Sequence, residues 1–496
     1  MDNKRSLLFF LLMFLALPCV VFSSLVDEYN SRITEYTLKN GMHFILLEDH
    51  TAPVISFHVH VKAGSKNEQI GETGISHLLE HLAFNGSTKI GTKNWKAEKQ
   101  LMEKMDETYA QLKKSEGTGA SEAECNKLRQ LFVELKQKAA SLSETNEFGK
   151  IFDMHGSVGP NAYTSYDMTA YWVELPSNKA ELWALLESDR LFHPVFRGFY
   201  EEIEVVKEER RMRVDNSPWG KLMEEFLGVA YRLHPYRNPI VGYPADLEHI
   251  NRSMIKDFYL THYLPSNIIV TVTGDIYPET FIPLVERYFD RVSCRKGPVP
   301  EIPQEPPRYS EKRVVIQMDA QPMLLIGFNI CDINHPDLPA LEICSEILAG
   351  GRTSRLYKKL VKEEHTAISV GSWCWGGEYP GIFYLSAVAS KDSDNNQIET
   401  SIYQVIDQLQ EGHIEAIEIS GAKARVKMEL LRSLRARREM AAELAWYKAA
   451  TGDWRNLFNY ASQLEKVTAE DIVRVVKKYF TQSNRTVATI ESLSKD

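Results

Sequence analysis

Two segments of the chain, far apart in the sequence, repeat one spaced pattern of residues. The intervals match between residues 255–270 and residues 472–487, where the corresponding sets are Ile255, Phe258, Tyr263 and Ser266-Asn267, and Ile472, Val475, Phe480 and Ser483-Asn484. Each segment has apolar residues at helical spacing that lead into a β-branched run. A helix-to-strand unit that recurs at this distance predicts two similar domains in one chain.

A proline-rich stretch separates the two halves. Five prolines fall between Gly297 and Arg308, and a segment this rich in proline cannot sustain a helix or a strand. We therefore predict an N-terminal domain over residues 28–294, a linker over residues 295–310 and a C-terminal domain over residues 311–496. A chain of 496 residues is long enough for two cores.

Both halves mix strand and helix patterns. In the first half, the pair Asn40-Gly41 favours a two-residue hairpin turn, a strand is expected over residues 162–175, and helices are expected over residues 179–191 and 199–213. The second half again places strands before helices. The predicted fold is α+β, with two similar domains that each pack a mostly antiparallel sheet with helices and face each other across a cleft.

Residues 95–143 differ in composition from the rest of the first half. Lys, Glu, Gln, Ala and Leu dominate this stretch, Gly117-Thr118-Gly119 interrupts it, and Ser121 and Glu124 have the spacing of a capping box. The pattern predicts two exposed helices that form a hairpin inserted in the N-terminal domain.

The N-terminus has the pattern of a secretory signal peptide. The basic pair Lys4-Arg5 precedes an apolar run over residues 7–22, which ends at small residues. We predict cleavage after residue 23 and export to the periplasm or the cell exterior. Because the run is short for a membrane span, no stable span is expected, although an uncleaved N-terminal anchor is the alternative.

Charge and cysteine spacing exclude two classes of function. The formal net charge is −9, whereas binding nucleic acid requires a basic surface. The cysteines have no CxxC spacing, so the sequence indicates neither a disulfide framework nor a thiolate zinc site.

The segment His77-Leu78-Leu79-Glu80-His81 carries the clearest chemical signal. Residues four apart lie on one face of a helix, so His77 and His81 can bind the same metal ion. Glu80 lies beside them, where a carboxylate can take a proton from a metal-activated water. A catalytic zinc site needs one more protein ligand.

An acidic helix over residues 201–210 is the best source of that ligand. Glu202, Val206 and Glu209 fall on one face at intervals of four and three residues. Spacing alone does not choose Glu209 over Glu208, and a run of Glu is also typical of a solvated helix face.

These motifs, together with Asn161-Ala162-Tyr163-Thr164-Ser165, resemble the pitrilysin/insulinase family of inverted-motif zinc metallopeptidases. The similarity runs through nearly the whole chain after the leader. With two domains rather than four, the chain resembles the half-length type of mitochondrial processing peptidase and its bacterial homologues. That type pairs its subunits, so the resemblance implies a homodimer or a heterodimer with a related subunit.

The resemblance also implies roles for single residues. His77, His81 and Glu209 would bind one Zn²⁺ per chain, Glu80 would act as the general base, and Glu202 would support the ligands from behind. The substrate-binding strand would contain Asn161, Ala162 and Tyr163, whose exposed edge pairs with an extended peptide.

The sequence departs from the family in two places. The spacer between His81 and Glu209 is longer than usual, and the predicted helical hairpin accounts for the extra length. In the second half, Val361 and Ile368 occupy positions where many relatives have an Arg and a Tyr that help to hold substrate.

The resulting hypothesis is a zinc-dependent endopeptidase that cleaves extended, unfolded peptides or short polypeptides, with Glu80 activating the attacking water. The main alternative is an assembly or substrate-presenting subunit of a heteromeric peptidase complex. A third reading is a zinc-binding protein without catalysis.

Overall fold

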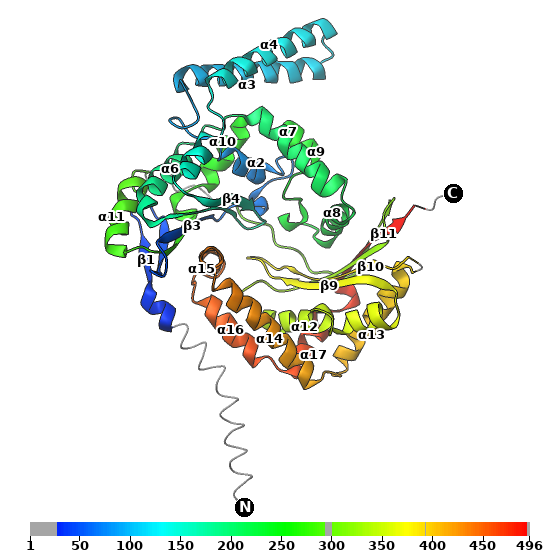
Figure 1. The fold of residues 1–496 in the computed structure, drawn as a ribbon. Helices are drawn as coiled ribbons and strands as arrows, with labels where there is room; N and C mark the ends of the chain where they lie inside the picture. The colour runs from blue at the N-terminus through cyan, green and yellow to red at the C-terminus, as the bar shows by residue number, and fades with distance from the viewer. Residues whose placement is uncertain (1–26, 293–299, 392, 494–496) are drawn as a thin grey trace, which may run out of the picture.

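The computed structural model describes residues 27–292, 300–391 and 393–493. The predicted signal peptide and the first part of the predicted linker lie outside these ranges. Two layers of helices enclose two sheets, and the chain passes from the first half, blue to green, to the second half, yellow to red (Figure 1). None of the helices in the described ranges is long and apolar enough to span a membrane.

The first sheet has six strands in the order β1-β2-β6-β3-β5-β4. Every neighbouring pair is antiparallel except β2 with β6. The strands are β1 (Ile33–Thr37), β2 (His43–Glu48), β3 (Val54–Val61), β4 (Val158–Thr164), β5 (Thr169–Pro176) and β6 (Ile268–Gly274).

The second sheet has five strands in the order β7-β11-β8-β10-β9, and only β7 with β11 is parallel. The strands are β7 (Lys312–Met318), β8 (Met323–Asn329), β9 (Ala367–Trp375), β10 (Ile382–Ala389) and β11 (Arg485–Ser492). Apart from β1, the two sheets have the same order and the same single parallel pair. The predicted fold class is therefore confirmed.

The repeated sequence pattern occupies equivalent places in the two halves. Helix α10 (Arg252–His262) leads through the short turn η5 (Pro265–Asn267) into β6, and α17 (Ala469–Tyr479) leads through η7 (Gln482–Asn484) into β11. Both β6 and β11 form the parallel pair of their sheet.

The remaining helices cover the outer faces of the sheets or lie between them. In the first half they are α2 (Ile75–Leu82), α5 (Glu147–Met154), α6 (Ala180–Phe192), α7 (Phe199–Arg210), α8 (Pro218–Ala230), α9 (Pro244–His249) and α11 (Pro278–Phe289), with short turns η1 (Ser65–Asn67), η2 (Ser177–Lys179), η3 (Arg211–Asp215) and η4 (Pro235–Arg237). In the second half they are α12 (Leu338–Ala349), α13 (Asn395–Gln410), α14 (Ala416–Ser433), α15 (Arg437–Thr451) and α16 (Asn456–Lys466), with the π-helical segment η6 (Tyr357–Glu363).

Each half packs one helix on the sheet of the other half. Phe226 of α8 is fully buried and contacts Tyr384 of β10 with ring centroids 5.6 Å apart. In return, Leu444 of α15 packs in a buried cluster with Ile45 and Ile269 of the first sheet. The two sheets thus face each other with α8 and α15 between them (Figure 1).

Helices α3 (Trp95–Gly117) and α4 (Glu122–Leu142) pack against each other and extend away from the two sheets (Figure 1). They lie in the range predicted as a helical hairpin. At its base, Arg197 pairs with the buried carboxylate of Glu98, and Arg252 pairs with Asp106. These ion pairs fix the insertion to the first half near α7.

Two local predictions were wrong. Residues 162–175 form a strand, a turn and a second strand, because the Ser165 hydroxyl accepts hydrogen bonds from the amides of Asp167 and Met168 and reverses the chain. Around Asn40-Gly41 the turn is longer than two residues, with Leu38 N donating to Met42 O. The Asn40 side chain is buried there and donates to Phe289 O, so it serves packing as well as the turn.

Candidate metal centre

Helix α2, which carries the HxxEH motif, begins at a capped N-terminus. Gly74 precedes it with φ 91°, and the buried Glu68 carboxylate accepts hydrogen bonds from Gly74 N at 2.8 Å and Ser76 N at 2.9 Å. These contacts satisfy amides that a helix leaves free at its start. Fixed in this way, α2 directs His77 and His81 to the same side, with ring centroids 4.8 Å apart.

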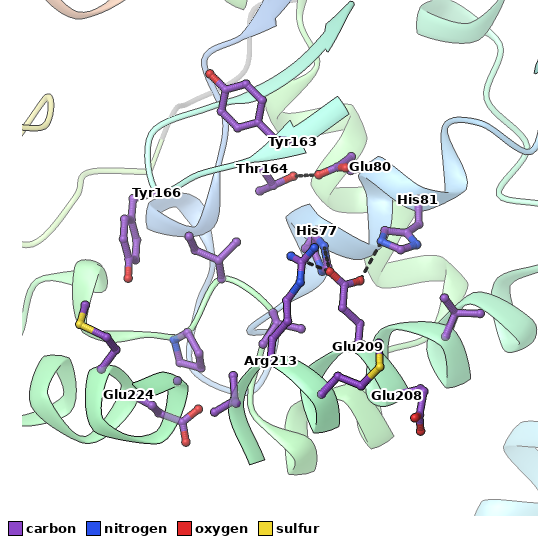
Figure 2. Close-up of a pocket in the computed structure, with 18 of the residues that line it drawn as sticks. His77, Glu80, His81, Tyr163, Thr164, Tyr166, Glu208, Glu209, Arg213 and Glu224 are labelled. Carbon is purple, nitrogen blue, oxygen red and sulfur yellow. Dashed lines mark hydrogen bonds and ion pairs between the residues drawn. The ribbon is translucent and has the colours of Figure 1, made fainter. Parts of the chain in front are cut away.

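Helix α7 brings Glu209 to the two imidazoles. Oε2 of Glu209 lies 3.3 Å from Nε2 of His81, and Oε1 lies 3.6 Å from Nε2 of His77 (Figure 2). The neighbouring Glu208 instead pairs with Arg211 and points away from the imidazoles (Figure 2). The structure therefore separates the two glutamates that spacing could not distinguish.

Glu202 lies behind His81. Nδ1 of His81 donates to Oε2 of Glu202 at 3.2 Å, and Nδ2 of Asn85 donates to Oε1 at 3.1 Å. The bond from His81 lowers the pKa of Glu202 and fixes the imidazole with Nε2 toward the cleft. Asn85 was not predicted, although its position four residues after His81 puts it on the same side of the chain as α2 ends.

His77, His81 and Glu209 form a triad, and Glu80 is buried beside it with 8% of its surface exposed. Thr164 Oγ1 of β4 donates to Glu80 Oε2 at 2.5 Å (Figure 2). Burial raises the pKa of Glu80, and this hydrogen bond opposes the rise. Thr164 was not predicted as a site residue. The alternation of side chains along a strand could have indicated it, because Thr164 shares one face of β4 with the predicted Ala162, whereas Asn161 and Tyr163 share the other.

The two histidines differ in their preference for a proton. Burial lowers the pKa of His77 to about 4. Burial would also lower the pKa of His81, but hydrogen bonds to Glu202 and Glu209 outweigh it and raise the pKa to about 9. The carboxylates thus make His81 a strong base directed at the shared position.

These side chains fit a zinc ion. One ligand atom from each of His77, His81 and Glu209 lies within 4.8 Å of the other two, and no other such group occurs in the described parts of the chain. Ligands about 2.0–2.1 Å from a tetrahedral ion lie about 3.3 Å apart, which is close to the two measured N–O distances. Three protein ligands of this type leave a fourth position open.

The triad opens into a cleft of about 1060 Å³ between α2, β4, α7, η3 and α8. Apart from the triad and Glu80, much of its wall is apolar and comes from Val205, Met212, Val214, Trp219, Met223, Leu227, Ile240 and Val241. Polar and charged groups lie among these, including Tyr166, Glu204, Glu208, Arg213 and Glu224.

The predicted substrate strand forms one side of this cleft. Among the described strands, β4 is the last of its sheet and pairs only with β5, so its other edge is free of them. Asn161, Ala162 and Tyr163 all line the cleft. The ring of Tyr163 points away from the triad (Figure 2) and lies 5.8 Å from that of Trp172.

The two second-half positions at which the sequence departs from the family lie outside this cleft. Val361 is in the π-helical segment η6 and Ile368 is in β9 with 55% of its surface exposed. Neither residue is among those that line the cleft.

Comparison with known proteins relates both halves of the chain to one family. The sequence profile described as Insulinase (Peptidase family M16) matches residues 43–109, which include the HxxEH helix, and the profile described as Peptidase M16 inactive domain matches residues 249–426. A zinc protease, PqqE, of Helicobacter pylori is 28% identical over 479 residues, which cover 94% of each chain. The chain belongs to the M16 family of peptidases.

Solved structures agree with this assignment. The crystal structure of a protease from H. pylori matches this M16 chain with a TM-score of 0.78 and 25% identity, and covers 92% of this chain and 99% of that one. The periplasmic protease PqqL from Escherichia coli shares the fold with a TM-score of 0.69, but the match covers 94% of this chain and only 49% of PqqL. The chain is therefore of the half-length M16 type.

A subunit of another peptidase is also similar to this M16 chain. The α subunit of mitochondrial-processing peptidase from Caenorhabditis elegans is 21% identical over 483 residues, covering 90% of this chain and 82% of that subunit.

Proposed function

We propose that this M16 chain is a zinc-dependent endopeptidase whose catalytic centre is the group formed by His77, Glu80, His81 and Glu209. The observation that carries the proposal is the convergence of α2 and α7, which gathers three metal-ligating side chains beside a buried carboxylate at the wall of a cleft. Relatives named zinc proteases support the same class of reaction.

His77, His81 and Glu209 would hold one zinc ion per chain, and Glu202 would orient His81. When bound, such an ion polarises a carbonyl group and lowers the pKa of water. Glu80 is buried and held by Thr164, so it can take a proton from the attacking water and later give it to the leaving amine.

The free edge of β4 supports an extended substrate. A peptide that pairs with Asn161, Ala162 and Tyr163 through its backbone would run past Glu80, because Thr164 joins that strand to the carboxylate. Backbone pairing favours unfolded peptides or short polypeptides over folded proteins. The apolar wall of the cleft would receive their side chains.

The Glu80→Gln variant tests this function. It should retain zinc, because Glu80 is not among the three ligand groups, yet lose hydrolysis of an unstructured peptide by at least about 10²-fold, because the general base is gone. Zinc content by mass spectrometry and peptide cleavage would be measured on the same sample. Normal peptidase activity in this variant would refute the assigned mechanism.

An assembly or substrate-presenting subunit remains the second candidate, because one relative is an α subunit and part of the chain matches an inactive-domain profile. The purified chain alone decides between the two. Chelator-sensitive cleavage without a partner supports the peptidase, whereas metal binding with no cleavage, even at high chain concentration, supports the subunit.

We further propose that residues 28–294 and 311–496 act as two domains, that residues 1–23 direct export to the periplasm or cell exterior, and that the chain pairs as a homodimer or a heterodimer. The basic-apolar N-terminus and the half-length type support these proposals. N-terminal sequencing of protein from whole cells would show whether the leader is removed or retained as an anchor.

A further inference from the structure

In the described parts of the chain, one Lys or Arg side chain lines the cleft. Among the residues that form its wall, within the described ranges, Arg213 is the only Lys or Arg, whereas five glutamates face the same space. Three of these glutamates have their own cations: Glu204 pairs with Lys207, Glu208 with Arg211 and Glu224 with Arg210. Arg213 is therefore the Lys or Arg side chain that, among the described residues, a substrate in the cleft would meet.

The turn after α7 explains why Arg213 differs from its neighbours. η3 is a π-helical turn that continues α7, and such turns often occur at functional sites. Arg210 is buried and bonds to Glu224 and Gly242 O, and Arg211 lies on the outside with Glu208. Only Arg213 is directed along the side of Glu209.

The guanidinium of Arg213 lies beside the triad and has donors to spare. Nη1 is 2.7 Å from Oε1 of Glu209 in an ion pair, and 71% of the side chain is exposed. A guanidinium has five N–H groups, so others can reach a substrate. Figure 2 shows it reaching up beside Glu209 toward His77.

Peptide hydrolysis creates a need for such a group. When water adds to the scissile carbonyl, the carbonyl oxygen gains negative charge, and donors already directed at this oxygen lower the barrier. Because Glu209 is one of three groups around the metal position, a donor in contact with its carboxylate is also near the carbonyl that reacts there. The other acids in the cleft would repel the developing charge.

We propose that Arg213 is a catalytic residue of the site, which donates a hydrogen bond to the oxyanion of the tetrahedral intermediate. The proposal rests on the peptidase function proposed above. Its nearest rival is that Arg213 merely positions Glu209, in which case its loss would weaken zinc binding instead.

The test compares zinc-loaded full-length chains carrying Arg213→Gln, Arg213→Lys or Arg211→Gln. Arg211→Gln is the matched control, since it removes the same charge two residues away from an outward-facing side chain that does not line the cleft. Four quantities are measured for each: kcat and KM on an unstructured peptide, the Kd of a phosphinic peptide of the same sequence, and the Kd of zinc by chelator competition. The phosphinate is a tetrahedral anion that imitates the intermediate.

For Arg213→Gln we expect kcat to fall by about 10²-fold and phosphinic-peptide binding to weaken by a similar factor, because a single oxyanion donor is lost. KM and zinc affinity should change by less than about threefold, since ground-state binding and the ligands remain. Arg213→Lys should recover part of kcat, and Arg211→Gln should match the unaltered chain.

Three results would overturn the proposal: equal kinetics in Arg213→Gln and Arg211→Gln, a rise in KM alone, or a loss of zinc affinity that accounts for the loss of kcat. The last would make Arg213 a positioning residue. If the unaltered chain neither cleaves peptide nor binds the phosphinic peptide, the peptidase function itself fails, and the role of Arg213 fails with it.

Discussion

Glu202 lies outside the three proposed ligands but contacts one of them. It accepts from His81 Nδ1 and from Asn85, which leaves His81 Nε2 facing Glu209. Residues in this supporting position tune the orientation and basicity of the ligand they contact. The effect of Glu202 should therefore appear in metal affinity before it appears in catalysis.

We expect Glu202→Gln to weaken zinc binding by about 10–100-fold, since the charge that supports His81 is removed. Glu201→Gln is the control, because Glu201 neighbours it on α7 but pairs with Lys136 of the helical hairpin. Chelator competition measures both. Equal zinc affinities in the two variants would show that Glu202 does not support the ligand.

Residue-level prediction is most specific where the signal is local. His77, Glu80 and His81 share one helical turn, so their spacing indicates shared chemistry, and the roles assigned to them stay predictions until activity is measured. Alternation along β4 indicates only which face Thr164 occupies. Its contact with Glu80, like that of Arg213 with Glu209, depends on how β4 and η3 approach α2 and α7.

At the level of elements, strand β3 has apolar side chains on one face and buried histidines on the other. Phe57 and Val59 belong to the first-half core. His58 and His60 alternate onto the opposite face, beneath α15, where the ring centroids of His60 and Trp446 are 6.4 Å apart. Within the described structure, neither ring nitrogen of His58 has a hydrogen-bond partner. Burial lowers the pKa of His58 to about 4.

This histidine should make stability depend on pH. In the unfolded chain His58 takes a proton near its ordinary pKa of about 6.5, but in the folded chain only near 4, so stability is lost as pH falls between these values. The loss from this one group is at most roughly 3 kcal/mol.

We expect His58→Gln to reduce the fall in the unfolding midpoint between pH 7 and pH 5. His413→Gln is the control, because the His413 side chain is 70% exposed. Denaturant unfolding at several pH values measures the difference. If the unfolding midpoint fell equally with pH in the unaltered chain and in both variants, His58 would not be held neutral by burial.

Element boundaries were predicted best where composition changes with structure. The helices expected over residues 179–191 and 95–143 correspond to α6 and to α3 with α4. The single strand expected over residues 162–175 failed because the turn at Ser165 uses a side-chain hydroxyl rather than Gly or Pro. The apolar alternation on both sides of that turn conceals it.

At the scale of the whole molecule, the loop after β9 fastens the second half to the first. The Tyr236 hydroxyl donates to Asp167 at 2.6 Å and accepts from Tyr379 N of that loop at 3.2 Å. Lys66 pairs with both Asp167 and Glu378. All but Glu378 and Tyr379 belong to the first half, so one buried polar cluster joins the two sheets.

We expect Tyr236→Phe to destabilise the folded chain by about 1–3 kcal/mol, because it removes one hydrogen bond to the buried Asp167 and leaves the Tyr379 amide without its partner. Tyr309→Phe removes the same atom from a side chain that is 86% exposed and should have no measurable effect. Thermal unfolding of both variants provides the comparison. Equal midpoints would show that the hydroxyl does not stabilise the junction.

The two halves also differ where their topology is equivalent. α12 follows β8 as α2 follows β3, and α12 packs against α14 as α2 packs against α7. Between α12 and α14, Glu346 pairs with Arg425 at 2.6 Å. An internal ion pair thus joins these helices, whereas His77, His81 and Glu209 converge between their counterparts.

The central claim is that α2 and α7 together form a metal site. A crystal of the zinc-loaded chain, with diffraction recorded on both sides of the zinc absorption edge, tests it most directly. We expect one anomalous peak per chain, within bonding distance of His77, His81 and Glu209. Anomalous density at any other place in a chain that cleaves peptides, with none between these three side chains, would contradict the account.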